Sequence, residues 1–172
     1  MAPRDHKTTC GGFTLVEIMI ALAIVGIVVM LATSTFRGMM EKYRVEGETK
    51  QMFADLMDAR GRAMQRNRVF HVQIATNGYK TFEDTNPAPD GDGNLTGSDT
   101  LVAGVTVKHT VTATGGLSNF QLNRSGIASA TGTIRLSSNV QNVQPDYDCI
   151  TVKATRIKMG QYNATTNACD EK

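Results

Sequence analysis

The sequence predicts an α+β fold in which the second half of a long N-terminal helix packs on a C-terminal domain of antiparallel strands. No proline occurs between Arg4 and Pro87, and residues 13–66 are rich in the helix formers Ala, Met, Leu, Glu, Lys, Arg and Gln. After residue 66 the chain changes to short segments rich in Thr, Val and Ile, which Gly, Ser and Asn separate. A helix followed by a run of strands is the element order of an α+β domain.

The first part of the helix, residues 13–32, predicts a transmembrane segment. Glu17 is the only ionisable residue among these twenty, and a helix of that length matches a bilayer core of roughly 30 Å. The second part, to residue 66, is amphipathic and predicts an apolar stripe that packs on the strands. The residues expected in the stripe are Tyr43, Met52, Phe53, Leu56, Met57, Ala63 and Met64. We expect one continuous helix with local softness at its glycines, which are Gly26, Gly38, Gly47 and Gly61.

Six segments beyond the helix have the composition and alternation of strands. The dipeptide Asn77-Gly78 is a hairpin signal between the first two. The expected strands are residues 69–75, 79–82, 100–108, 117–122, 132–136 and 149–158.

Glu17 is the sharpest feature of the sequence, because it places a carboxylate in an otherwise apolar segment. A charge at the centre of a membrane helix costs about 2.5 to 3.5 kcal/mol on insertion scales, so such a group usually has a partner. Cleavage between Gly12 and Phe13 would create an amino group four residues before Glu17, and that amine could pair with Glu17 of a neighbouring subunit. The alternative is an uncut signal anchor whose Glu17 lies near the membrane interface.

The segment GGFTLVEIMIALAIVGIVVMLA, residues 11–32, resembles the class III leader and N-terminal helix of type IV pilins and pseudopilins. The resemblance implies a leader at residues 1–12, removed by a prepilin peptidase, and N-methylation of the new terminus, Phe13. It also implies that Glu17 is the carboxylate that guides assembly above an inner-membrane platform. Major pilins often carry a proline later in this helix; the residue here is Ser34, so proline-linked helix melting is not implied.

Later segments are similar to the GspH/FimT-type minor pilins and pseudopilins. These segments are residues 58–69, 82–86 and 120–136. The resemblance therefore implies a single-pass inner-membrane protein whose head domain, residues 67–172, lies in the periplasm. Its implied partners are the peptidase, the assembly platform and other pilins or pseudopilins.

Three functions follow from this resemblance. The first is a minor pilin that helps to initiate or cap a type IV pilus, and the second is the equivalent pseudopilin of a type II secretion system. The third is a DNA-binding pilin for transformation, since some FimT-like pilins bind DNA through a Gly-Arg-x-Arg patch. The counterpart here keeps two cations, Arg156 and Lys158, but lacks the glycine. The net charge of +2 does not point to nucleic acid, and DNA binding is the least favoured of the three.

The cysteines predict one disulfide in the exported domain. Cys10 would leave with the leader, and Cys149 and Cys169 would remain as an even pair. In an oxidising periplasm we expect these two to form a structural bond, with two free thiols as the alternative.

The sequence offers no pattern of catalysis or of cofactor binding, so we expect a structural protein and not an enzyme. His71 and His109 lack metal-ligand spacing. The loop at residues 84–99 is rich in Asp, and Asp90 begins a partial calcium-loop pattern that Leu95 and Leu101 interrupt. A solvated loop is the better interpretation of that segment.

Overall fold

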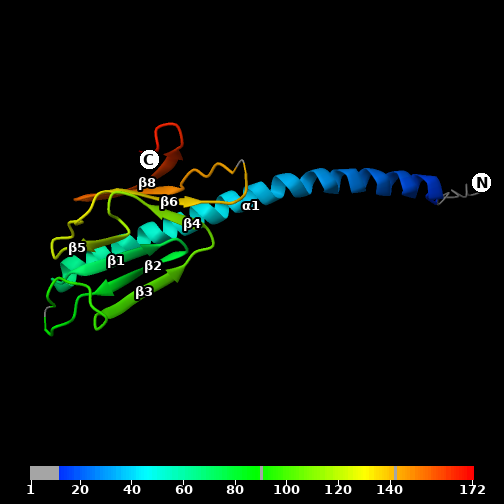
Figure 1. Ribbon diagram of the computed structural model, residues 1–172. Coiled ribbons are helices and arrows are strands. Elements are labelled where there is room, and N and C mark those ends of the chain that lie inside the picture. Colours follow the sequence, from blue (N-terminus) through cyan, green and yellow to red (C-terminus); the bar gives the residue numbers. More distant parts are fainter. Residues whose placement is uncertain (1–11, 90, 142) are drawn as a thin grey trace, which may run out of the picture. The chain divides into compact units, whose positions relative to one another are not determined.

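The computed structural model describes residues 12–89, 91–141 and 143–172, without the side chains of residues 31–35. The chain divides into two compact units, residues 1–37 and 38–172, and each is described here by itself (Figure 1). Helix α1, Leu15–Arg66, contributes to both units. The other elements all belong to the second unit, residues 38–172, which we call the head domain from here on; it thus includes the second half of α1 as well as the segment 67–172.

Helix α1 confirms the predicted long helix and runs unbroken through its four glycines. It ends in a Schellman motif, in which Asn67 adopts a positive φ of 52° and the Arg68 amide donates to the Ala63 carbonyl at 3.2 Å. Asparagine tolerates this left-handed conformation better than most residues, and it allows the chain to turn sharply into the first strand.

The described part of the head domain contains nine strands in two antiparallel sheets (Figure 1). The first sheet has the order β3-β2-β1-β5 and the second the order β4-β6-β7-β8-β9. The strands are β1 Phe70–Ala75, β2 Gly78–Glu83, β3 Thr100–Thr106, β4 Thr110–Ala113, β5 Asn119–Leu122, β6 Gly132–Ser137, β7 Cys149–Lys153, β8 Arg156–Asn163 and β9 Ala168–Glu171.

The hairpin at Asn77-Gly78 is confirmed, whereas two of the strand predictions need correction. The segment 149–158 is not one strand: it is β7 and the start of β8, joined by a turn at Ala154 and Thr155 that lacks glycine or proline. The segment 100–108 ends as a strand at Thr106. Strands β4 and β9 were not predicted, because each has only four residues and depends on pairing with a neighbouring strand.

The buried stripe of α1 follows alternating steps of four and three residues. It consists of Val45, Thr49, Met52, Leu56, Ala59 and Ala63, all at most 2% exposed. The expected members Met52, Leu56 and Ala63 are confirmed. The prediction is wrong for Tyr43, Met57 and Met64, because their side chains are exposed. The predicted stripe relied mainly on large apolar residues. The observed stripe also contains small residues, such as Ala59 and Ala63, which allow the sheets to approach the helix closely.

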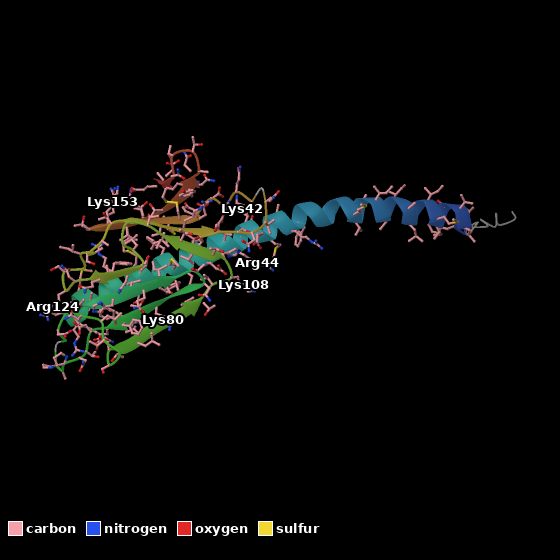
Figure 2. The ribbon with its side chains drawn as sticks, in the orientation of Figure 1. Lys42, Arg44, Lys80, Lys108, Arg124 and Lys153 are labelled. Carbon is pink, nitrogen blue, oxygen red and sulfur yellow. A yellow bond between two sulfur atoms is a disulfide. The ribbon has the colours of Figure 1, made fainter. Side chains whose placement is uncertain are left out.

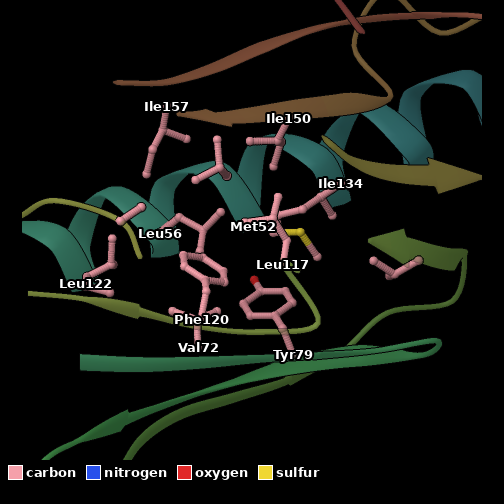
Figure 3. Packing of buried hydrophobic residues seen from close by; sticks show 14 of the residues in the cluster. Met52, Leu56, Val72, Tyr79, Leu117, Phe120, Leu122, Ile134, Ile150 and Ile157 are labelled. Atoms are coloured by element: carbon pink, nitrogen blue, oxygen red, sulfur yellow. The ribbon is translucent and has the colours of Figure 1, made fainter. Parts of the chain in front are cut away.

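The core of the head domain forms where this stripe meets side chains of both sheets (Figure 3). Phe120 and Val72 come from the first sheet and Ile134 and Ile150 from the second; each is at most 1% exposed. A hydrogen bond also joins the first sheet to the helix: the Tyr79 hydroxyl donates to the Asp55 carboxylate of α1 at 2.5 Å. Burial raises the pKa of this tyrosine, so it remains the donor.

Two groups of polar contacts attach α1 to the strands. Near the start of the head domain, His109 is buried between two helix carboxylates: its Nδ1 lies 2.6 Å from Glu48 and its Nε2 3.0 Å from Glu41. At the end of the helix, Arg66 and, two residues beyond it, Arg68 both pair with the buried Glu83 of β2. These contacts fix the rotation of the helix on the sheets.

The predicted disulfide is confirmed: Cys149 of β7 and Cys169 of β9 are joined, with their Cα atoms 5.9 Å apart. These two strands are not adjacent, since β8 lies between them. The bond therefore holds the C-terminal edge strand to the middle of its sheet.

Replacing both cysteines by alanine should lower the free energy of unfolding of the head domain by about 3 kcal/mol, the value for closing a loop of this length in the unfolded chain. Urea denaturation of the variant and of the parent measures the change, and the parent after reduction should show a comparable loss. A difference below about 1 kcal/mol would show that the C-terminal strand is held by its hydrogen bonds alone.

The acidic loop at residues 84–99 is organised by its own carboxylates. Asp99 accepts the amides of Thr85 and Asn86, each at 3.1 Å, and Asp84 accepts the Gly93 amide at 2.6 Å. Among the described residues no cluster of three or more acidic, histidine or cysteine side chains is arranged to hold a metal ion. Asp90, the first residue of the partial calcium pattern, lies outside the described residues.

His71 of β1 is enclosed beneath this loop. It is 1% exposed, and its neighbour across the sheet, Gln121, donates to the Gly93 carbonyl of the loop at 2.8 Å. Its Nε2 has no hydrogen-bond partner among the described residues. Burial lowers the pKa of His71, although the carboxylates of Asp84, Asp99 and Asp92 oppose that effect in part.

The head domain should consequently lose stability as the pH falls below about 6.5, the value expected for an unfolded histidine. A lowered pKa in the folded state means that the unfolded chain takes up the proton first. The contribution of neutral His71 is therefore complete above that pH and declines below it. Urea titrations at pH 7.5 and 5.5 measure the loss, which His71→Gln should reduce. Equal pH dependence in the two proteins would contradict this assignment.

Candidate assembly site

Helix α1 begins with a capped first turn that contains Glu17. The Glu17 amide donates to the Thr14 hydroxyl at 3.2 Å, and the Ile18 amide donates to the Thr14 carbonyl at the same distance. Thr14 is therefore the N-cap, and Glu17 is the third helical residue, where the helix dipole favours a carboxylate. The pattern Thr-x-x-Glu is that of a capping box, which is a local signal in the sequence for the start of the helix at this point.

Gly12 and Phe13 lie just before this cap. Both are exposed and neither is helical, and the Phe13 side chain is 78% exposed. The peptide bond between them is thus accessible in the folded chain. The remainder of the predicted leader, residues 1–11, lies outside the described residues.

The helix after the cap is apolar on every side and exposed. Its exposed large apolar residues are Leu15, Val16, Ile18, Met19, Ile20, Leu22, Ile24, Val25, Ile27, Val28, Val29 and Met30. Within the described chain the ion pairs begin at Glu41, and none includes Glu17. A segment that is hydrophobic all round is usually buried among other apolar groups, and a carboxylate within such a segment usually has a partner.

The prediction of a membrane span at residues 13–32 is not confirmed. Within the part of the chain that the structure describes, no helix is both long enough and apolar enough to cross a membrane.

The two cations considered for DNA binding are not free. Arg156 and Lys158 both pair with Glu171 of β9, at 3.2 and 3.4 Å, and Lys153 pairs with the same carboxylate at 2.9 Å. The three cations lower the pKa of Glu171, so it remains ionised and offsets part of their charge. Figure 2 shows other basic residues, such as Lys80 and Arg124, elsewhere on the head domain.

The sequence comparison that decides the family covers residues 48–155, which match the family model of the type II transport protein GspH. This match spans more than half of the chain. The chain belongs to the GspH family. Residues 7–33 also match the model of the prokaryotic N-terminal methylation motif. The GspH-family chain is therefore a pilin-like protein of the minor-pilin and pseudopilin type, and the predicted family resemblance is confirmed.

A similar solved structure is that of the type IV minor pilin FimU from Pseudomonas aeruginosa, with 14% sequence identity and a TM-score of 0.47. The similarity covers 76% of this chain and 96% of that chain. A comparison of this chain with curated proteins found no match.

The two matched ranges divide the site residues of the GspH-family chain. The methylation motif contains Gly12, Phe13 and Glu17. The GspH match extends from the second half of α1 to the turn after β7, so it contains Cys149 but ends just before Arg156 and Lys158. The N-terminal residues are thus the ones that the comparisons relate to a known motif.

Proposed function

We propose that this protein is a minor pilin, made as a precursor that a prepilin peptidase cuts between Gly12 and Phe13. The mature subunit, with Phe13 N-methylated, joins a type IV pilus in low copy and helps to initiate or cap the filament. The observation that carries the proposal is the exposed, all-apolar start of α1 with its single carboxylate, in a chain whose head domain matches GspH.

Before assembly, the apolar segment 13–32 would hold the precursor in the inner membrane, with the head domain in the periplasm. Twenty residues with one ionisable group support the anchoring. The Cys149–Cys169 disulfide supports a periplasmic location of the head domain, because such bonds persist in the oxidising periplasm and are rare in the cytoplasm.

Assembly would then be guided by pairing between Glu17 and an N-terminal amine. The carboxylate has no ion pair within the described residues, and removal of the leader gives each subunit a new cation at Phe13. Pairing across two subunits would neutralise both charges and set the axial position of the incoming helix at the membrane platform. The role is structural, and the residues supply contacts and not catalysis.

A second candidate is a minor pseudopilin of a type II secretion system. The description of the matched family as a type II transport protein favours it. The cleavage, the Glu17 pairing and the helix packing would be the same in both machines.

Deletion of the gene in its native host tests the proposal and separates the two machines. Loss of surface pili with normal secretion identifies a pilus subunit, and the opposite result identifies a pseudopilin. If neither process changes, and the tagged protein is absent from sheared filaments, the proposed role is wrong. Complementation with the intact gene is the control.

A further inference from the structure

One flank of α1 in the head domain is apolar but is not covered by the sheets. Met57, Arg60 and Met64 are three and four residues apart, so they lie above one another on a single side of the helix. This side is about a quarter turn from the buried stripe, given roughly 100° per residue. Met57 and Met64 are 40% and 49% exposed, although methionine is commonly a core residue.

A rigid turn after β5 borders this flank. A Cβ atom added to Gly126 would meet Met64 and Arg60 at about 3 Å, so the backbone of the turn lies against both side chains. Asn123 holds the turn by accepting the amides of Ser125 and Ile127 at 3.0 and 2.8 Å. The turn also presents Ile127, which is 39% exposed. The flank is therefore preformed.

Arg60 lies in the middle of this surface and forms no ion pair with a carboxylate of the described residues. Its Nε is buried and has no hydrogen-bond partner among the described residues. The neighbouring arginines of α1 differ, because Arg62 pairs with Asp58 at 2.7 Å and Arg66 pairs with Glu83. The Nε atom is closed off from solvent, but the side chain as a whole is only partly buried. A carboxylate of a binding partner would pair with the exposed part of this guanidinium group in a charge-assisted hydrogen bond.

We infer that Met57, Arg60, Met64 and Ile127, here called the arginine flank, bind a neighbouring pilin-type subunit of different sequence. That subunit would present a carboxylate surrounded by apolar side chains. Methionine and arginine are enriched in protein interfaces, and arginine is one of the residue types that occur most often among the few that dominate the binding energy. Methionine also adapts its shape to a partner. The choice of a pilin-type subunit rests on the proposed function, whereas the chemistry of the flank does not.

Photo-crosslinking of the full-length protein in filament-forming cells tests the inference. Benzoyl-phenylalanine is placed at position 57, and at position 58 as a control, in otherwise identical chains. Position 58 is two residues from Arg60 and therefore on the opposite side of the helix. We expect an adduct from position 57 only, with the crosslinked peptide of the other subunit containing Asp or Glu.

Charge reversal supplies the second arm of the experiment. Arg60→Glu should reduce the adduct from position 57 about tenfold, and changing the identified carboxylate to Arg should restore it. Arg62→Glu is the matched control, because it reverses a charge on the opposite flank, and it should leave the yield unchanged. Thermal melts of the variants exclude loss of folding as the cause.

The inference is overturned by equal yields from Arg60→Glu and Arg62→Glu, or by a crosslinked segment without a carboxylate. An adduct with lipid or with a second copy of this chain also contradicts it. Incorporation of the unsubstituted protein into filaments is measured in the same cells. If the protein is incorporated but gives no adduct at position 57, the inferred role of the arginine flank is wrong and the proposed function stands.

Discussion

Glu17→Ala should leave cleavage of the precursor intact but reduce its incorporation into filaments at least tenfold. The substitution removes the only carboxylate of an all-apolar segment, so the N-terminal amine of the neighbouring subunit would be left without its partner. An unpaired charge in an apolar environment costs several kcal/mol, which is enough for this effect. The measurement is a quantitative immunoblot of sheared filaments and of the membrane fraction.

Two variants separate the pairing role of Glu17 from its place in the first turn of the helix. Glu17→Asp keeps the charge and should retain part of the incorporation. Thr14→Ala removes the N-cap bond to the Glu17 amide and leaves the carboxylate, so it should have a small effect. If Thr14→Ala is as damaging as Glu17→Ala, the carboxylate acts mainly on helix stability and the pairing account is wrong.

Phe120→Ala should lower the free energy of unfolding of the head domain by about 3 to 5 kcal/mol, which is the usual cost of deleting a buried phenylalanine. Phe120 is 1% exposed and lies in the core that α1 shares with the first sheet (Figure 3). The cavity would lie among side chains of the helix and of neighbouring strands, so it cannot close by moving one residue. Urea denaturation of residues 38–172 measures the loss.

Ile127→Ala is the control for this experiment, because it also shortens an apolar side chain but at an exposed position. Its effect on stability should be within about 0.5 kcal/mol. A loss below about 1 kcal/mol for Phe120→Ala would show that the helix and the first sheet do not share a single core.

The sequence predicted those elements whose signals are local. The continuous helix follows from composition and from the absence of proline, and the β1–β2 hairpin follows from Asn77-Gly78. The helical stripe was predicted only in part, because burial of Ala59 depends on where the sheets approach and not on its own hydrophobicity. The short edge strand β9 depends on pairing with β8, so it has no comparable local signal.

The candidate site shows the same division. Gly12, Phe13 and Glu17 are contiguous, so one segment of sequence was sufficient to propose them. Pairing of Arg156 and Lys158 with Glu171 could not be predicted, since it requires the register of β9 beside β8. The contacts of His109 with Glu41 and Glu48 join residues more than sixty positions apart. Such contacts are determined by the packing of sheets on the helix.

Intact-mass analysis of the protein, produced with and without a prepilin peptidase, tests the central claim most directly. With the peptidase, we predict the mass of residues 13–172 plus one methyl group, with the disulfide formed. Without it, the mass should remain that of the full precursor. An unchanged mass in the presence of the peptidase, or a cut at any bond other than Gly12–Phe13, would contradict the account.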